Sequence, residues 1–141
     1  MSQLNIALMG AGGKMGGRIT NNIKNLPDYK VMYVEVSEGG RAAMAERGVN
    51  ATLQEEALAS ADVVVLALPD KLIGRITTNI MAQLKPGAMI VSLDPAAAHA
   101  GVIPIREDLT YFIAHPCHPP LFNDETTDAA RKDFFGGVHA K

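Results

Sequence analysis

The sequence predicts an α/β fold built on a doubly wound, mainly parallel sheet. Short apolar runs alternate with segments of helical periodicity along the whole chain. Residues 63–68 are apolar on both faces, which is typical of a parallel strand that helices cover on each side. The first apolar run, residues 5–9, leads directly into a glycine-rich loop, Gly10-Ala11-Gly12-Gly13-Lys14-Met15-Gly16.

The first half of the chain predicts two strands and three helices. The strands are residues 5–9 and 31–36. Gly39-Gly40 begin the second helix, and Thr52-Leu53-Gln54-Glu55 has the pattern of a capping box that starts a short third one. The first helix follows the glycine loop and ends at Pro27-Asp28. Its apolar residues at helical spacing are Met15, Ile19, Ile23 and Leu26.

The second half predicts three more strands, at residues 63–68, 89–93 and 111–114. A helix begins at Pro69-Asp70, and a last helix covers about 125–135. The connections are long enough for right-handed parallel crossovers, so ligands should bind at the carboxyl ends of the strands. The residues expected to face inward on the longer helix are Leu72, Ile73, Ile76, Ile80 and Leu84.

Composition excludes several classes of partner. The 141 residues fit one domain, and the net charge of −2 comes without a basic stripe, which argues against a nucleic-acid partner. We expect no membrane span, because the longest apolar run is far too short, and the start of the chain lacks the pattern of a signal peptide. The single cysteine, Cys117, fits a reducing compartment, so we expect a cytoplasmic protein.

The glycine loop is the pattern of a Rossmann-type dinucleotide site. A pyrophosphate needs backbone amides that it can approach closely and a helix N-terminus directed at it. A loop that follows a strand and opens a helix is the context that such a motif requires. Lys14 either lies near the phosphates or is a solvated lysine in the first helical turn. The predicted cofactor-binding residues of the loop are Gly10, Ala11, Gly12, Gly13, Lys14, Met15 and Gly16.

Glu35 predicts which dinucleotide binds. It lies near the end of the second strand, about 20 residues after Gly16. An acidic residue at this spacing accepts hydrogen bonds from the adenosine ribose and repels a 2′-phosphate. This favours NAD over NADP; the alternative is a surface carboxylate at a strand end.

Two further loops are expected beside the nicotinamide. The backbone around Leu68 and Pro69 should touch the cofactor, and the main role of Asp70 should be to cap its helix. Asp94, with Pro95, ends the next strand and either lines the reaction site as a catalytic residue or simply forms a turn.

His115-Pro116-Cys117-His118-Pro119-Pro120 is the most unusual stretch and follows the last predicted strand. The prolines would stiffen it and hold two imidazoles in fixed directions. Three interpretations stay open for His115 and His118. One histidine could be the base that takes a hydroxyl proton during hydride transfer, one or both could bind a metal, or both could be structural.

These stretches together resemble the D-apionate oxidoisomerase family, which belongs with the 6-phosphogluconate and 3-hydroxyisobutyrate dehydrogenases. The resemblance covers essentially the whole chain. It implies an NAD-dependent enzyme that oxidises a hydroxyl of a branched sugar acid and rearranges the carbon skeleton to a 3-oxo product. Such a migration is helped by a Lewis acid, which favours a divalent metal at His115. The matching stretches are the glycine loop, residues 34–38, residues 68–74 and residues 115–125.

Members of this family carry a second, mostly helical domain that closes the substrate site and usually forms the homodimer. We expect residues 1–141 to be the NAD-binding domain alone, with that helical domain absent, as in a shortened form or a proteolytic remnant. The chain alone should bind NAD weakly and turn over substrate poorly.

Other functions are also compatible with a Rossmann-type sheet. They are a non-catalytic dinucleotide-sensing module, a related 6-phosphogluconate or 3-hydroxy acid dehydrogenase, and a methyltransferase. Dihydrodipicolinate reductase has a very similar loop, but its later substrate motif has no match in this sequence.

Overall fold

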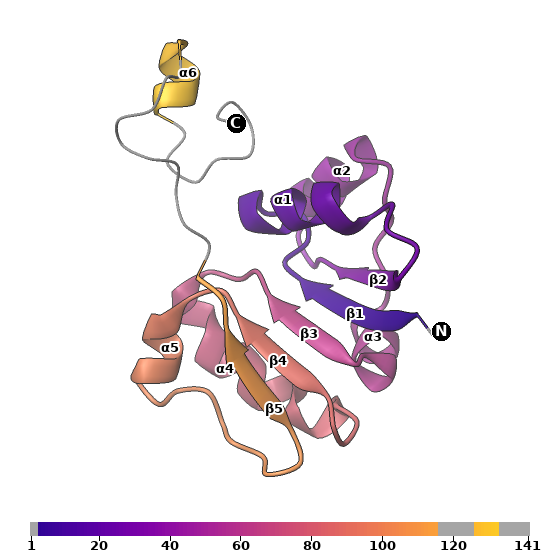
Figure 1. Cartoon of the computed structure of the whole chain (residues 1–141), viewed down its shortest axis with the longest axis vertical. Helices are drawn as coiled ribbons and strands as arrows, with labels where there is room; N and C mark the ends of the chain where they lie inside the picture. Colours follow the sequence, from indigo (N-terminus) through magenta and orange to yellow (C-terminus); the bar gives the residue numbers. More distant parts are fainter. Residues whose placement is uncertain (1–2, 116–125, 133–141) are drawn as a thin grey trace.

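A computed structural model describes residues 3–115 and 126–132 of the chain, and its centre is a five-stranded parallel sheet (Figure 1). The strand order is β2-β1-β3-β4-β5, so the chain winds outward in both directions from β1. This confirms the doubly wound parallel fold that the sequence predicts. The strands are β1 (Leu4–Met9), β2 (Tyr29–Val34), β3 (Val63–Leu66), β4 (Met89–Ser92) and β5 (Thr110–Ile113).

Helices cover both faces of the sheet (Figure 1). On one face, α1 (Lys14–Ile23) and α2 (Glu38–Glu46) pack over a small core that contains Leu8 and Met44. On the other face lie α3 (Gln54–Ser60), α4 (Asp70–Ile80) with its extension η1 (Met81–Gln83), and α5 (Pro95–His99), over a larger core. A short helix, α6 (Asp128–Arg131), follows later in the chain. Within the described ranges, no helix combines the length and the apolar character that crossing a bilayer needs.

The first helix buries small residues instead of its apolar stripe. Gly16, Gly17 and Thr20 are buried, whereas Met15 and Ile19 are only half-buried. A Cβ on Gly16 would lie 2.2 Å from Gly10 O, so the helix can approach the loop this closely only with small residues. The prediction that this helix includes Leu26 and ends at Pro27-Asp28 is wrong: α1 ends at Ile23, and Leu26 is exposed.

Three other expectations need correction. The second and third strands end at Val34 and Leu66, each two residues before its predicted end. The capping box is wrong, because the N-cap of α3 is Leu53 and no described side chain caps it. Thr52 N donates instead to Tyr33 O (2.7 Å), which holds this segment extended alongside β2. The last helix is described only as Asp128–Arg131, and the rest of its predicted range lies partly outside the described residues.

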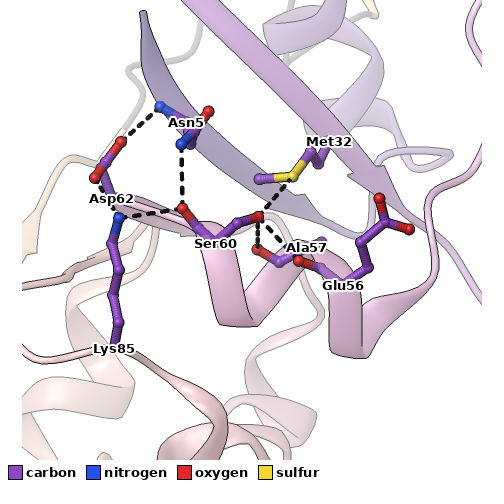
Figure 2. Close-up of polar contacts among 7 residues, drawn as sticks. All are labelled: Asn5, Met32, Glu56, Ala57, Ser60, Asp62 and Lys85. Atoms are coloured by element: carbon purple, nitrogen blue, oxygen red, sulfur yellow. Dashed lines mark hydrogen bonds and ion pairs between the residues drawn. The ribbon is translucent and has the colours of Figure 1, made fainter. Parts of the chain in front are cut away.

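A polar cluster closes the amino-terminal edge of the sheet (Figure 2). Lys85 Nζ donates to Asp62 Oδ1 (2.6 Å) and to Ser60 O (3.2 Å). Asn5 donates its backbone N–H to Asp62 Oδ2 (2.8 Å) and its side-chain amide to Ser60 O (3.3 Å). These bonds join the start of β1 to the segments that precede β3 and β4, at the edge opposite the carboxyl ends of the strands.

Candidate functional site

The register of the sheet aligns the carboxyl ends of all five strands. Met9 pairs with both Val34 and Leu66, Leu66 pairs with Ser92, and Ser92 pairs with Ile113. The loops that follow these residues therefore lie along one edge of the sheet. In strand order, that edge carries Glu35, the glycine loop, Leu68, Asp94 and His115.

The glycine loop turns sharply out of β1 and into α1. Gly10 has a φ of +76°, which glycine adopts without strain, and its N–H donates to Val34 O (2.9 Å). A Cβ on Gly10 would lie 2.3 Å from Ala67 O, so the loop also packs tightly against the segment after β3. Ala11 is fully buried beneath this turn.

The amino terminus of α1 opens at this edge. Gly13 is its N-cap, no described side chain caps it, and its first turn carries no acidic residue. An uncapped helix N-terminus has backbone donors and a partial positive charge, which suits an anionic ligand. Lys14, the first residue of α1, is exposed, and Met15 faces a neighbouring hollow.

Glu35 follows β2 directly and reaches back to the glycine loop. Its Oε2 accepts the Gly12 N–H (3.1 Å), and its Oε1 accepts the N–H groups of Val36 and Ser37 and the Ser37 hydroxyl, each at 2.9 Å. Partial burial raises the pKa of this carboxyl, but the hydrogen bonds from Ser37, Gly12 and Val36 outweigh it, so the pKa lies below its ordinary value. Glu35 is therefore a charged acceptor at neutral pH.

The segment after β3 contributes backbone and an apolar side chain. Leu68 Cδ2 would lie 3.1 Å from a Cβ on Gly10, so this leucine packs beside the glycine loop. The expectation that Asp70 caps α4 is wrong. Pro69 is the N-cap, Asp70 is already the first helical residue, and no described side chain makes a cap bond there. Asp70 lies one position too late to cap this helix.

Asp94 caps a helix that the sequence did not predict. Its carboxylate accepts the Ala96 N–H at the start of α5, and its carbonyl accepts the Ser92 hydroxyl (2.8 Å). An aspartate followed by proline is a recognised helix start, so Asp94-Pro95 carries a signal for this helix as well as for a turn. Asp94 lies at the site edge, and its carboxylate is used at least in part for structure.

His115 lies at the far end of the row from Glu35. Its Nδ1 is 3.0 Å from Leu93 O, and because a carbonyl only accepts, Nδ1 carries the proton and Nε2 is left as the basic nitrogen. His118 and Cys117 lie outside the described residues.

A hollow of about 340 Å³ lies beside His115 and is lined by residues of α1 and of the segments that follow β4 and β5. Arg18 and Asn22 line it and were not singled out from the sequence. Their spacing from Met15, three and seven residues along a helix, is the signal that could have found them. The hollow is lined by Met15, Arg18, Ile19, Asn22, Leu93, Ala114 and His115.

Within residues 3–115 and 126–132, no three His, Cys, Asp or Glu side chains gather as a metal-binding group. His115 is therefore not part of a ligand set among the residues that the structure describes.

Most of this edge lies in a region that matches a known protein family. The model of the family described as "NADP oxidoreductase coenzyme F420-dependent" matches residues 5–95, which include the glycine loop, Glu35 and Asp94. The chain belongs to this family. The match spans β1 to the start of α5 and so covers most of the edge just described.

Curated relatives match nearly the whole chain. A D-apionate oxidoisomerase from Cupriavidus necator is 54% identical over 137 residues, covering 96% of this chain and 49% of the relative. One from Blautia hydrogenotrophica is 46% identical, covering 100% of this chain and 50% of the relative. The chain thus spans about half the length of the curated relatives it matches.

A solved structure agrees with this family assignment. A semialdehyde dehydrogenase NAD-binding protein from Cupriavidus necator, in complex with calcium and NAD, is 53% identical and superposes with a TM-score of 0.83. The match covers 100% of this chain and 51% of that chain.

Proposed function

We propose that this chain is the NAD-binding part of an oxidoreductase that acts on a sugar acid. The observation that carries the proposal is the alignment, along one sheet edge, of a glycine-lined helix N-terminus with the Glu35 carboxylate on one side and His115 on the other. The reaction we propose is the oxidation of D-apionate coupled to a skeletal isomerisation that gives a 3-oxo acid. The names of the relatives support this substrate.

The glycine loop would hold the pyrophosphate. Gly10, Gly12 and Gly16 allow the loop to pack tightly against its neighbours, and a Cβ on Gly13 would meet only Gly10 O, at 3.4 Å. The uncapped start of α1 supplies amide donors and positive potential. Ala11 and Met15 complete the turn, and Lys14 lies in the first helical turn, where a cation would face the phosphates.

Glu35 would hold the adenosine ribose and select NAD. Its carboxylate is charged and fixed beside the Gly12 amide, where it can accept a ribose hydroxyl and repel a 2′-phosphate. The family description names NADP. We propose NAD for this chain because of the residue at this position.

The nicotinamide would lie toward β3, β4 and β5, against the backbone of Leu68 and Pro69. NAD supplies a hydride acceptor when bound. His115 Nε2 would take the proton of the substrate hydroxyl, since Nδ1 is engaged with Leu93 O. His118 remains a second candidate for this role, and Asp94 would help to shape the loop beside them.

The hollow next to His115 would receive a small sugar acid. In each relative, about half of the sequence lies outside the region that matches this chain. We propose that this other half forms a helical domain, which completes this site and makes the contacts of a homodimer. A cytoplasmic location fits the single cysteine. The proposal contains no nucleic-acid or membrane partner.

None of the proposed steps uses a divalent metal. The described residues do not supply a ligand set, so His115 would need partners from elsewhere to hold one. The calcium in the Cupriavidus necator structure belongs to that protein. Titration of the protein with divalent cations, followed through the His115 ring NMR signals, tests whether this histidine binds a metal.

Binding assays test the cofactor half of the proposal. Thermal shift and calorimetry with NAD, NADP and S-adenosylmethionine should give stabilisation by NAD, weaker stabilisation by NADP and none by S-adenosylmethionine. Glu35→Gln should weaken NAD binding by about tenfold, the loss expected for a hydrogen bond to a charged group. Tighter binding of NADP than of NAD would overturn the assignment, and stabilisation by S-adenosylmethionine alone would indicate a methyltransferase.

An activity assay tests the substrate. The chain alone should reduce NAD slowly with D-apionate, whereas a chimera completed with the second half of the Cupriavidus necator relative should do so readily. NAD binding without turnover by the chimera would favour a dinucleotide sensor. Turnover of 6-phosphogluconate or a 3-hydroxy acid in place of D-apionate would favour a related dehydrogenase.

A further inference from the structure

The two oxygens of the Glu35 carboxylate have different hydrogen-bond partners. Its Oε1 accepts three hydrogen bonds, from Val36 N, Ser37 N and Ser37 Oγ. Its Oε2 accepts one from the described residues, from Gly12 N. A carboxylate offers about four acceptor positions, so Oε1 is committed to the protein and Oε2 keeps capacity for a ligand hydroxyl. The position of this side chain therefore decides whether a ribose can be recognised.

Gly40, in the first turn of α2, lies directly against this carboxylate. A Cβ on Gly40 would lie 2.4 Å from Glu35 Cδ and 2.7 Å from both Cγ and Oε2. Real Cβ atoms do not approach other atoms this closely, so a methyl group at position 40 and the present position of Glu35 exclude each other. The carboxylate can lie where it does because residue 40 has no side chain.

The backbone around Gly40 is the less yielding partner in this conflict. Its N–H donates to the Ser37 hydroxyl (3.1 Å), and Arg41 N donates to Ser37 O (3.0 Å), so the start of α2 is anchored. The Gly12 backbone also packs against Gly40, since a Cβ on Gly12 would lie 2.3 Å from Gly40 Cα. Glu35 presents side-chain atoms, Cγ, Cδ and Oε2, which can rotate away from a new methyl group at the expense of the four hydrogen bonds to the carboxylate.

We propose that Gly40 is a specificity-determining positioning residue: because it has no side chain, it leaves room for the Glu35 carboxylate beside the Gly12 amide and thereby sets the preference for NAD over NADP. This inference rests on the proposed function, in which Glu35 receives the adenosine ribose. A side chain at position 40 turns the carboxylate away from the Gly12 amide, which removes both the ribose acceptor and the charge that repels a 2′-phosphate. Arg41, whose Nε donates to Glu35 O (3.0 Å), then remains beside the same loop as a cation.

The test compares Gly40→Ala with Gly39→Ala. These are neighbouring glycines in the first turn of one helix, and a Cβ on Gly39 would meet nothing within 4 Å. Calorimetry with NAD and with NADP should show that Gly40→Ala lowers the ratio of NAD to NADP affinity by about tenfold or more, the scale of one charged hydrogen bond. Gly39→Ala should leave the ratio within about twofold, a change of under half a kcal/mol.

A readout on Glu35 itself separates positioning from general damage. NMR titration of the carboxyl carbon should show that the Glu35 pKa rises toward its ordinary value in Gly40→Ala and stays low in Gly39→Ala, because only the first change breaks the bonds that lower it. An NAD-to-NADP ratio in Gly40→Ala equal to that of the wild type would overturn the inference, as would an unchanged Glu35 pKa.

A second variant keeps the test decisive if Gly40→Ala does not fold. Glu35→Ala removes Cγ, Cδ and Oε2, the three atoms that the new methyl group would meet. The double variant Glu35→Ala, Gly40→Ala should therefore fold, and its NAD-to-NADP ratio should lie close to that of Glu35→Ala alone. A double variant that stays unfolded, or one whose ratio differs from that of Glu35→Ala alone by about tenfold or more, would overturn the inference.

The wild-type titration separates this inference from the proposed function. A wild type that binds neither dinucleotide would overturn the proposed function and this inference with it. A wild type that prefers NAD, combined with a Gly40→Ala variant of the same preference, would overturn this inference alone.

Discussion

His115 Nδ1 lies 3.0 Å from the carbonyl oxygen of Leu93, which ties the imidazole at the end of β5 to the loop after β4. Asparagine can place an amide N–H near the position of Nδ1 while removing Nε2. We expect His115→Asn to keep the free energy of unfolding within about 0.5 kcal/mol of the wild type. We expect it to slow NAD reduction by the D-apionate-oxidising chimera by about a hundredfold or more, the usual contribution of a general base.

The control for this variant is His99→Asn, at the exposed last residue of α5. Its rate should match that of the wild type. A His115→Asn enzyme with the wild-type rate would show that His115 is structural.

Asp94 caps α5, and that role can be separated from a catalytic one. Asp94→Ala should lower the free energy of unfolding by about 1 kcal/mol, because the Ala96 N–H loses its acceptor. Asp94→Asn should recover most of that stability, since asparagine caps about as well. Urea unfolding measures both variants. If Asp94→Asn is stable but loses turnover, the carboxylate has a catalytic role in addition to the cap.

The ion pair between Asp62 and Lys85 should make stability depend on pH. The Lys85 hydrogen bond, with that from Asn5 N, holds the pKa of Asp62 below its ordinary value. A carboxyl with a lowered folded-state pKa contributes stability above its unfolded pKa of about 3.9 and loses that contribution as the pH falls through the folded value. Both side chains are about a third exposed, at 33% and 37%, which limits the contribution.

We therefore expect Asp62→Asn to lower the free energy of unfolding at pH 7 by about 1 kcal/mol at most, with the difference shrinking as the pH falls below the unfolded pKa of about 3.9. Urea unfolding across this pH range measures it. Asp28→Asn, at an exposed carboxylate before β2, is the control and should change little at any pH. A deficit in Asp62→Asn that is the same at pH 3 and pH 7 would contradict the assignment.

The Tyr111 hydroxyl links β5 to the loop before it. It donates to Pro104 O (3.0 Å) and accepts the Arg106 N–H (2.8 Å). Tyr111→Phe leaves both backbone groups without this partner in a half-buried position, so the free energy of unfolding should fall by about 1–2 kcal/mol. Tyr29→Phe, at an exposed tyrosine, should lower the free energy of unfolding by less than about 0.5 kcal/mol. Thermal melts distinguish the two, and equal losses would contradict a role for the Tyr111 bonds.

The sheet was predictable because each of its strands carries a local signal, whereas α5 in the crossover from β4 to β5 was not predicted. The apolar run at 63–68 and the glycine loop were enough to place β3 and β1 in a parallel sheet. The buried face of α1 was not predictable from periodicity, because the close approach of Gly16 to Gly10 favours small residues over Met15 and Ile19. How near two elements lie is a tertiary property.

The candidate site was predictable at the level of loops. Parallel strands bring their carboxyl ends together, so Glu35 and His115 were expected on one edge. The partners of Glu35 were not predictable, because its bond to Gly12 depends on how closely α2 packs against the glycine loop. Asp70 was assigned as a cap because its residue type is common there, and a shift of one position was enough to make that wrong.

The aligned register fixes the distance between the two ends of the site edge. Glu35 follows β2 and His115 follows β5, which are the two outer strands, and four inter-strand spacings of about 4.8 Å separate them by about 19 Å. That length is fixed by the number of hydrogen-bonded strands and not by any side chain in the loops. Substitutions along the edge can therefore change which ligand groups bind near Glu35 or near His115. The distance that an extended ligand must cover between them stays constant.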